Sequence, residues 1–370
     1  MKNSNVKRLL LFAVFLVTAF TPVSAELQLK DYWMVDEFFS EFPAQKKTFE
    51  TFNKRVQSNL PQKINSSKTV SISIVYPGLQ VSDYWRRSVA SFSKRLDQKD
   101  IKYRIDSLFT KPGSEFSLQL QQVRKSLIAD TDYLVFTLDA LRHKNLIEKV
   151  IAQSATKVIL QNITTPVKAF GQQQPFMYVG FDHSIGSQML AKKYIEVADE
   201  NSEYAILYGT KGYVSAVRGD TFQDIIAHST NMKLVASYYV DFNREKAAIA
   251  TREILKEHPK IKFIYACSTD IALGVSDVLA EVGLTGKIMV NGWGGGSAEL
   301  DGIQNGQLNF TVMRMNDDNG VAMAEGIALD LLGKAHEVPI IYSGDFRLVD
   351  QNTSAKEIVA LKQRAFRYSR

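Results

Sequence analysis

The sequence has a single cysteine, five scattered histidines and, beyond its first residues, no apolar run long enough to cross a membrane. Cys267 has no cysteine to pair with, and its apolar neighbours in 263–267 predict a small buried side chain. No histidine has a metal-ligand partner at the usual spacing, and neither a Gly-x-Ser-x-Gly elbow nor a Gly-Lys-Ser/Thr phosphate loop occurs. These absences argue against metalloenzymes, serine hydrolases and nucleotide hydrolases.

The first 25 residues have the features of a secretory signal peptide. Basic residues precede an apolar run from Leu9 to Phe20, and Val23-Ser24-Ala25 follows as a small-residue cleavage site. The run has 12 residues, whereas about 20 are needed to span a bilayer. We therefore expect a protein of the periplasm whose mature chain begins near Glu26.

Basic charge is less abundant than the composition suggests. The formal net charge is +6, and removal of the three basic residues in the leader would leave +3. The remaining charges are dispersed rather than massed in basic runs, which argues against a nucleic-acid partner. The mature chain is long enough for two lobes, each with its own core.

From Thr69 the chain alternates strands and helices, which is typical of a parallel sheet with helices on both faces. A polar link at 169–175 interrupts this rhythm, and a second series of the same kind follows. We predict an α/β protein with two doubly wound parallel-sheet lobes, joined by a hinge and separated by a ligand cleft. The predicted parts are a signal peptide, 1–25; an N-terminal helical extension, 26–66; an N-terminal lobe, 67–175 and 293–342; and a C-terminal lobe, 176–292 and 343–370.

One turn of the first lobe carries the first candidate binding residues. The apolar run 69–76 predicts a buried strand that ends at Pro77-Gly78, with a helix beginning at Ser82 as its N-cap. This turn presents Gln80, Ser82 and Trp85 at the carboxyl end of a strand, where ligands bind in open α/β sheets. The alternative is that Trp85 belongs to the core and that Ser82 only caps the helix.

Turns after later predicted strands carry amides, hydroxyls, arginine and tryptophan. These candidates are Asn162, Ser268, Thr269, Asp270, Trp293 and Arg314, and Arg218 joins them from the helix predicted after the strand 204–208. Tryptophan faces suit the apolar face of a small ring, amides and hydroxyls bond its oxygens, and two arginines add fork-shaped cationic donors. Together they predict a pocket for a small, polyhydroxylated and anionic ligand.

Each of these turns has another interpretation. Residues 268–270 could form only a cap with an acidic first turn, Arg314 could pair with Asp317 and Asp318 at the surface, and the glycines of 292–296 could serve a tight crossing between lobes. The convergence of several turns on the same chemistry favours binding. Scattered carboxylates leave glycoside hydrolysis as a minor alternative, but we predict no enzymatic activity and no catalytic residue.

The chain resembles the periplasmic autoinducer-2 receptors, a family within the ribose-binding-like (type I) periplasmic binding proteins. The resemblance rests on long motifs spread over the whole predicted mature chain. They are Val-Tyr-Pro-Gly at 75–78, Gln-Val-Ser-Asp-Tyr-Trp at 80–85, Leu-Gln-Asn-Ile-Thr-Thr-Pro at 160–166, and the segments 263–270, 291–301, 312–318 and 364–369.

The resemblance implies a quorum-sensing function. The ligand would be autoinducer-2 as a furanosyl borate diester, held between the lobes, and the partner would be the periplasmic region of a LuxQ-like membrane sensor histidine kinase. No cofactor is implied, since boron enters as part of the ligand. The contacts implied by motif are Gln80, Ser82, Trp85, Asn162, Arg218, Ser268, Thr269, Trp293 and Arg314. A sugar-binding protein that feeds a membrane transporter is the alternative.

Overall fold

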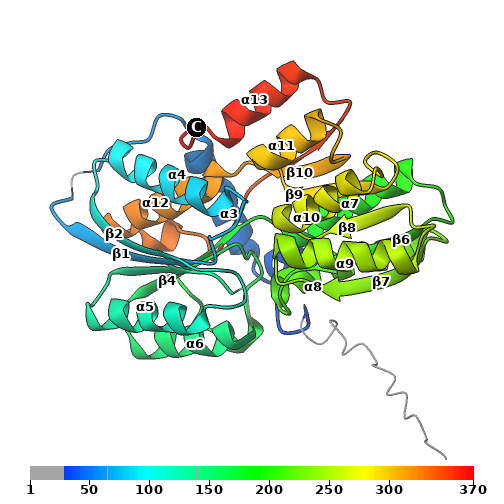
Figure 1. Ribbon diagram of the computed structural model, residues 1–370. Helices are drawn as coiled ribbons and strands as arrows, with labels where there is room; N and C mark the ends of the chain where they lie inside the picture. Colours follow the sequence, from blue (N-terminus) through cyan, green and yellow to red (C-terminus); the bar gives the residue numbers. More distant parts are fainter. Residues whose placement is uncertain (1–28, 65, 139–140) are drawn as a thin grey trace, which may run out of the picture.

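The computed structural model describes residues 29–64, 66–138 and 141–370, and the predicted signal peptide lies outside these ranges. Within them the chain forms two α/β lobes side by side, each built on a six-stranded sheet (Figure 1). Helices cover both faces of each sheet, so the predicted doubly wound fold is confirmed.

The first lobe contains an entirely parallel sheet in the order β11-β5-β4-β3-β1-β2. Its strands are β1 (Thr69–Tyr76), β2 (Lys102–Phe109), β3 (Tyr133–Phe136), β4 (Lys157–Gln161), β5 (Met177–Gly180) and β11 (Ile341–Ser343). Every residue of β3 is buried, as expected for an apolar strand covered on both faces. The covering helices are α4 (Tyr84–Gln98), α5 (Phe116–Ile128), α6 (Leu141–Gln153) and α12 (Asp317–Leu331).

The predicted N-terminal extension contains two helices, α2 (Val35–Glu41) and α3 (Pro43–Gln57). Helix α3 begins with a proline, whose fixed φ suits the first helical turn, and it packs against α12 and β11. Its Phe52 and Val56 are fully buried in the core of the first lobe. The described part of the extension therefore belongs to the folded body.

The second lobe contains a sheet in the order β12-β10-β9-β8-β6-β7, parallel except for β12, which runs antiparallel to β10. Its strands are β6 (Glu203–Tyr208), β7 (Lys233–Tyr239), β8 (Phe263–Ala266), β9 (Met289–Gly294), β10 (Phe310–Arg314) and β12 (Phe346–Asp350). Its helices are α7 (His183–Val197), α8 (Tyr213–Ser229), α9 (Arg244–Glu257), α10 (Thr269–Glu281), α11 (Ser297–Gln304) and α13 (Ala355–Ala365).

The predicted lobe boundaries are wrong at two strands. Strand β5 was expected in the C-terminal lobe, but it pairs with β4 and therefore belongs to the first sheet. Strand β10 was expected in the N-terminal lobe, but it pairs with β9 in the second sheet, so the chain returns to the first lobe only at α12. Strand membership depends on hydrogen bonds between segments distant in sequence, which a break in local rhythm does not encode.

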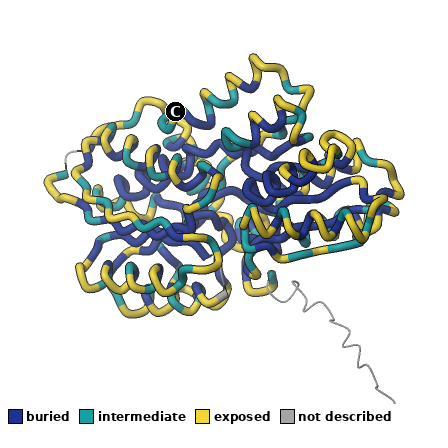
Figure 2. The backbone as a smooth tube through the Cα atoms, in the orientation of Figure 1, coloured by how far each residue is buried: buried dark blue, intermediate teal, exposed yellow. Residues whose placement is uncertain are grey.

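Buried residues follow the two sheets and the helices that cover them (Figure 2). In the second lobe an aromatic cluster joins the sheet to its helices: Phe222 stacks on Tyr265 with centroids 3.8 Å apart, and Tyr194 stacks on Phe263 at 4.2 Å. Cys267 is buried and free, as predicted. Across the described ranges, no helix combines the length and apolar character needed to cross a bilayer.

Candidate ligand-binding site

A cavity lies between the lobes, at the carboxyl ends of the strands. Its lining contains nine of the ten predicted site residues: Gln80, Ser82, Trp85, Asn162, Arg218, Ser268, Thr269, Trp293 and Arg314. Five further residues complete the lining: Pro77, Tyr84, Pro112, Val214 and Phe242. The structure therefore brings the predicted set together from both lobes.

The first-lobe wall is the turn between β1 and α4. A side chain at Gly78 would lie 2.2 Å from the Phe109 ring, so the turn can pass this ring only as glycine. The Gln80 amide donates to the carbonyl of Pro77, which holds the turn closed. Trp85 packs on Tyr76 with centroids 4.6 Å apart and also lines the cavity, so it serves the core and the pocket at once.

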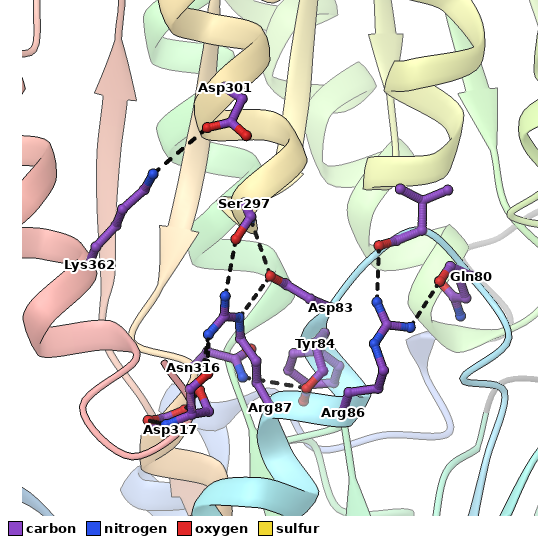
Figure 3. A network of polar contacts seen from close by, with 12 residues as sticks. Gln80, Asp83, Tyr84, Arg86, Arg87, Ser297, Asp301, Asn316, Asp317 and Lys362 are labelled. Carbon is purple, nitrogen blue, oxygen red and sulfur yellow. Dashed lines mark hydrogen bonds and ion pairs between the residues drawn. The ribbon is translucent and has the colours of Figure 1, made fainter.

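Helix α4 begins one residue later than predicted. Its N-cap is Asp83 rather than Ser82, and the Asp83 side chain does not bond the helix's own backbone. The Asp83 carboxylate instead accepts from the backbone N–H of Ser297 in the second lobe at 3.2 Å and from Arg87 at 2.7 Å (Figure 3). Arg87 also donates to the Ser297 hydroxyl at 3.0 Å, so these residues join the two lobes beside the cavity.

Asn162 directly follows β4 and has the left-handed conformation, with φ of 66°. This backbone geometry is uncommon outside glycine, although asparagine tolerates it better than most residues. The side-chain Oδ1 of Asn162 is buried and has no hydrogen-bond partner among the residues that the structure describes. An unsatisfied acceptor at the cavity wall is suited to a hydroxyl donor on a ligand.

Arg218 and Arg314 are the charged members of the lining, with 4% and 5% of their surface exposed. Neither makes an ion pair with a described residue within 4.0 Å. Arg218 stacks over Trp293 at 3.7 Å, and Arg314 stacks over Tyr84 at 4.0 Å. Burial, and then the charge of Arg314, lower the pKa of Arg218 to about 9; burial also lowers the pKa of Arg314. Both remain cations at neutral pH.

The glycine-rich turn after β9 shapes the space for Arg314. A side chain at Gly294, where φ is 138°, would lie 2.4 Å from the guanidinium of Arg314. The buried carboxylate of Glu299 accepts from the backbone N–H groups of Trp293 at 2.9 Å and Gly295 at 2.7 Å. Gly294 therefore leaves space for Arg314, whereas a side chain at Gly296 would lie 2.5 Å from Asp83 of the first lobe, so the glycines serve both the pocket and the close approach of the lobes.

Hydroxyls of the second lobe reach the cavity from the start of α10. Ser268 is the N-cap, its Oγ accepting from the Ile271 N–H at 3.4 Å, and Thr269 is the first helical residue. Both also line the cavity. Ser268 and Thr269 therefore form the start of the helix and line the cavity at the same time. The suggested surface pair of Arg314 with Asp317 and Asp318 does not form, because those carboxylates bind the C-terminal segment.

Asp270 was predicted to contact the ligand, but it is absent from the cavity lining. Its carboxylate crosses between lobes and accepts from the backbone N–H groups of Val81 at 2.8 Å and Ser82 at 3.1 Å. Burial raises the pKa of Asp270, partly opposed by these two donors. The side chain holds the first-lobe turn against the second lobe, since the two N–H groups use its oxygens.

Asp270→Asn is expected to weaken ligand binding roughly tenfold, about 1.5 kcal/mol, because a charge-assisted contact of the closed form is lost. Calorimetry would measure the affinity, and small-angle scattering the compaction on ligand addition. The matched control is Asp277→Asn on the same helix, which removes an exposed ion pair with Arg244. Unchanged affinity in Asp270→Asn would mean that closure does not depend on this contact.

Sequence reasoning missed several lining residues and one supporting residue. Tyr84 and Pro77 lie within a motif already selected, whereas Pro112 and Phe242 come from loops that were not selected and Val214 comes from the start of α8. Phe242 has φ of 54°, a conformation that costs energy in a bulky residue and is set by tertiary contacts. His183 lies behind the lining and bonds two of its members, and nothing in its neighbourhood in the sequence predicted this.

The site has the features of a binding pocket between two lobes. Within the described ranges, no group of three or more histidine, cysteine or acidic side chains could hold a metal ion. Fold and pocket together define a two-lobe α/β binding protein for a small polar ligand.

The chain belongs to the periplasmic binding protein family: residues 74–335 match the family described as "Periplasmic binding protein domain". It is similar to the D-allose-binding periplasmic protein of Escherichia coli K12, with 25% identity over 261 residues, 69% of this chain and 83% of that protein. This is a family of binding proteins, not of enzymes.

Solved structures share the fold. An ABC transporter periplasmic solute binding protein from Actinobacillus succinogenes 130z with bound D-allose superposes with a TM-score of 0.68 at 20% identity, covering 79% of this chain and 99% of that chain. A structure of the XylFII–LytSN complex superposes with a TM-score of 0.65 at 17% identity, covering 77% of this chain and 98% of that chain.

Proposed function

We propose that this protein is a LuxP-like receptor of the periplasm that binds autoinducer-2 as a furanosyl borate diester in the cavity between its lobes. The ligand carries one negative charge on its tetrahedral borate. Its ring presents hydroxyl oxygens to the amide and hydroxyl groups of the lining and an apolar face to the two tryptophans.

The observation that carries this proposal is the pair of buried arginines without a carboxylate partner. Burying a cation costs several kcal/mol unless an anion or hydrogen bonds compensate. The lining contains two cations, Arg218 and Arg314, and none of its fourteen residues is acidic. An anionic ligand supplies the missing ion-pair partner, whereas a neutral sugar leaves both arginines without one.

The second part of the proposal is that the closed, liganded form signals to the periplasmic region of a LuxQ-like sensor histidine kinase. The XylFII–LytSN complex supports it in one respect: a protein of this fold can associate with a second protein. The protein would need no cofactor, because boron arrives with the ligand. Residues 1–25 would direct export and be removed.

The second candidate is a sugar-binding protein that feeds a membrane transporter. The comparisons favour it directly, because the curated relatives are named for binding D-allose, D-apiose and ribose. Under this function the ligand is a neutral sugar, and the arginines act as donors to its hydroxyls. The two candidates differ in the charge and boron content of the ligand.

The test is to express the full chain with its leader in medium with and without borate and to analyse the exported protein. We expect native mass spectrometry to detect a bound species with the boron isotope pattern, which is lost in borate-free medium. N-terminal sequencing of the same sample should begin near Glu26. A boron-free sugar bound equally in both media would favour the transport function instead.

A further inference from the structure

The residue that bridges the two halves of the cavity from behind is His183. It is the first residue of α7, just after the chain leaves the first sheet at β5. Asp182 caps this helix, its carboxylate accepting from the Ser184 N–H at 2.9 Å, which fixes the first turn. The imidazole is fully buried and packs edge-on against Trp293, with centroids 5.3 Å apart.

Both ring nitrogens of His183 bond residues that line the cavity. Nε2 lies 2.9 Å from the carbonyl oxygen of Asn162, and Nδ1 lies 3.4 Å from Nε of Arg218. The guanidinium Nε always carries a hydrogen, so Nδ1 must accept and Nε2 must donate. The two partners belong to different lobes, Asn162 at the end of β4 and Arg218 in α8.

The hydrogen bonds of His183 restrict Arg218 and Asn162 in different ways. Arg218 also donates from its Nη1 to the Cys267 carbonyl at 2.9 Å, so two of its nitrogens are held and Nη2 is left for the cavity. On the other side, His183 holds the backbone carbonyl of Asn162. The backbone of Asn162 has φ of 66°, and in this conformation the residue lines the cavity.

We infer that His183 is a positioning residue of the ligand pocket: its neutral imidazole, in the Nε2–H form, holds Asn162 and Arg218 in their ligand-facing orientations. This inference extends the proposed function, but it does not depend on which ligand the pocket takes. Burial, and then the positive charge of Arg218, lower the pKa of His183 well below its usual value, and Arg314 acts in the same direction. The Asn162 carbonyl acts in the opposite direction and only partly offsets them, and Tyr213, which also faces the ring, is a phenol.

The first experiment needs no ligand. Two-bond ¹H–¹⁵N correlation spectra of protein labelled with ¹⁵N-histidine report the tautomer of each ring, and His183→Asn assigns the signal. We expect the neutral Nε2–H pattern for His183 at pH 6 to 8. An Nδ1–H tautomer, or a protonated ring at pH 6, would overturn the inference whatever the ligand is.

The second experiment is a double-mutant cycle on binding. His183→Leu removes both hydrogen bonds and should lower affinity roughly tenfold to a hundredfold, the range for hydrogen bonds to charged groups. His183→Asn, whose amide oxygen can replace the acceptor Nδ1, should recover part of the loss. His183→Leu should lower affinity at least tenfold less in an Arg218→Met protein than in the wild-type protein, because part of its effect acts through Arg218. Losses that simply multiply would show a general packing role.

The cycle uses autoinducer-2 with borate or D-ribose, whichever the wild-type protein binds. If the protein binds D-ribose and not the borate ligand, the proposed function fails, but the positioning role of His183 is still tested, because either ligand contacts the same arginine. His336→Asn, an exposed histidine, is the matched control and should leave affinity and tautomer pattern unchanged. Melting temperatures of all variants exclude unfolding as the cause of lost binding.

Discussion

Replacing Arg314 by methionine is expected to lower the affinity for the borate ligand by about a hundredfold while raising the melting temperature of the empty protein. Within the described part of the chain, the guanidinium is buried without an ion-pair partner, and its Nε has no hydrogen-bond partner. A hydrogen bond to a charged group contributes about 1.5 to 3 kcal/mol, and the borate would accept at least one such bond. The same unpaired cation destabilises the empty folded state, so its removal should stabilise it.

The two effects have opposite signs, which distinguishes this prediction from simple damage to the pocket. Arg314→Lys keeps the charge but loses the planar fork and the stacking on Tyr84, so its affinity should lie between wild type and methionine. Arg218→Met should weaken borate-ligand binding in the same way. Calorimetry with and without added borate would measure the affinities, and thermal melts the stability.

The matched control is Arg104→Met on β2, an exposed arginine that is not part of the cavity lining, which should change neither quantity. An equal loss of affinity with and without borate would make the arginines general donors to the ring. Charge selection would then have to be abandoned. A lower melting temperature of the empty Arg314→Met protein would show that its stacking contributes more than its burial costs.

The second large effect is expected on stability, from Asp318→Ala at the start of α12. Its side chain is 1% exposed and accepts two hydrogen bonds from Arg364, at 2.9 and 2.6 Å, and one from Arg367. The neighbouring Asp317 accepts from the backbone N–H groups of Tyr368 and Ser369. The two carboxylates hold the end of the chain on the first lobe after α13.

Asp318→Ala should lower the free energy of unfolding by about 3 kcal/mol, because breaking a buried ion pair leaves an uncompensated charge. This value is at the low end of the range for breaking a buried ion pair, because only one of the two arginines stays buried. Arg364 is 35% exposed and can be hydrated again, whereas Arg367 is 9% exposed. The melting temperature should fall by roughly 5 to 10 °C.

The control for this change is Asp301→Ala on α11, which removes an exposed pair with Lys362 at 3.8 Å (Figure 3). We expect less than about 0.5 kcal/mol from it. Equal effects of the two substitutions, by chemical denaturation, would mean that the end of the chain is not held by Asp318. If Asp318→Ala lowers stability but leaves affinity unchanged, the contacts of Asp318 do not contribute to ligand binding.

Much of the pocket was predictable because ligand sites in doubly wound sheets lie in the turns after strands, and a turn is a local feature. Gln80, Ser82 and Trp85 follow one buried run, and Ser268 and Thr269 follow another, so their types and places could be recognised together. Asp270 shares the same turn but not the same role. Its carboxylate finds two backbone donors in the other lobe, and no local pattern indicates what faces a side chain across a cleft.

The sequence by itself determined the alternation of strands and helices, the doubly wound class and the residue types at the strand ends, because each follows from hydrophobic period and turn chemistry over a few residues. Tertiary structure alone decided that β5 and β10 exchange lobes relative to the prediction, since strand pairing joins distant segments. It also decided that Arg218 and Arg314 are buried without an acid, and that His183 bonds both lobes. Burial and charge compensation depend on what the whole fold places around a side chain.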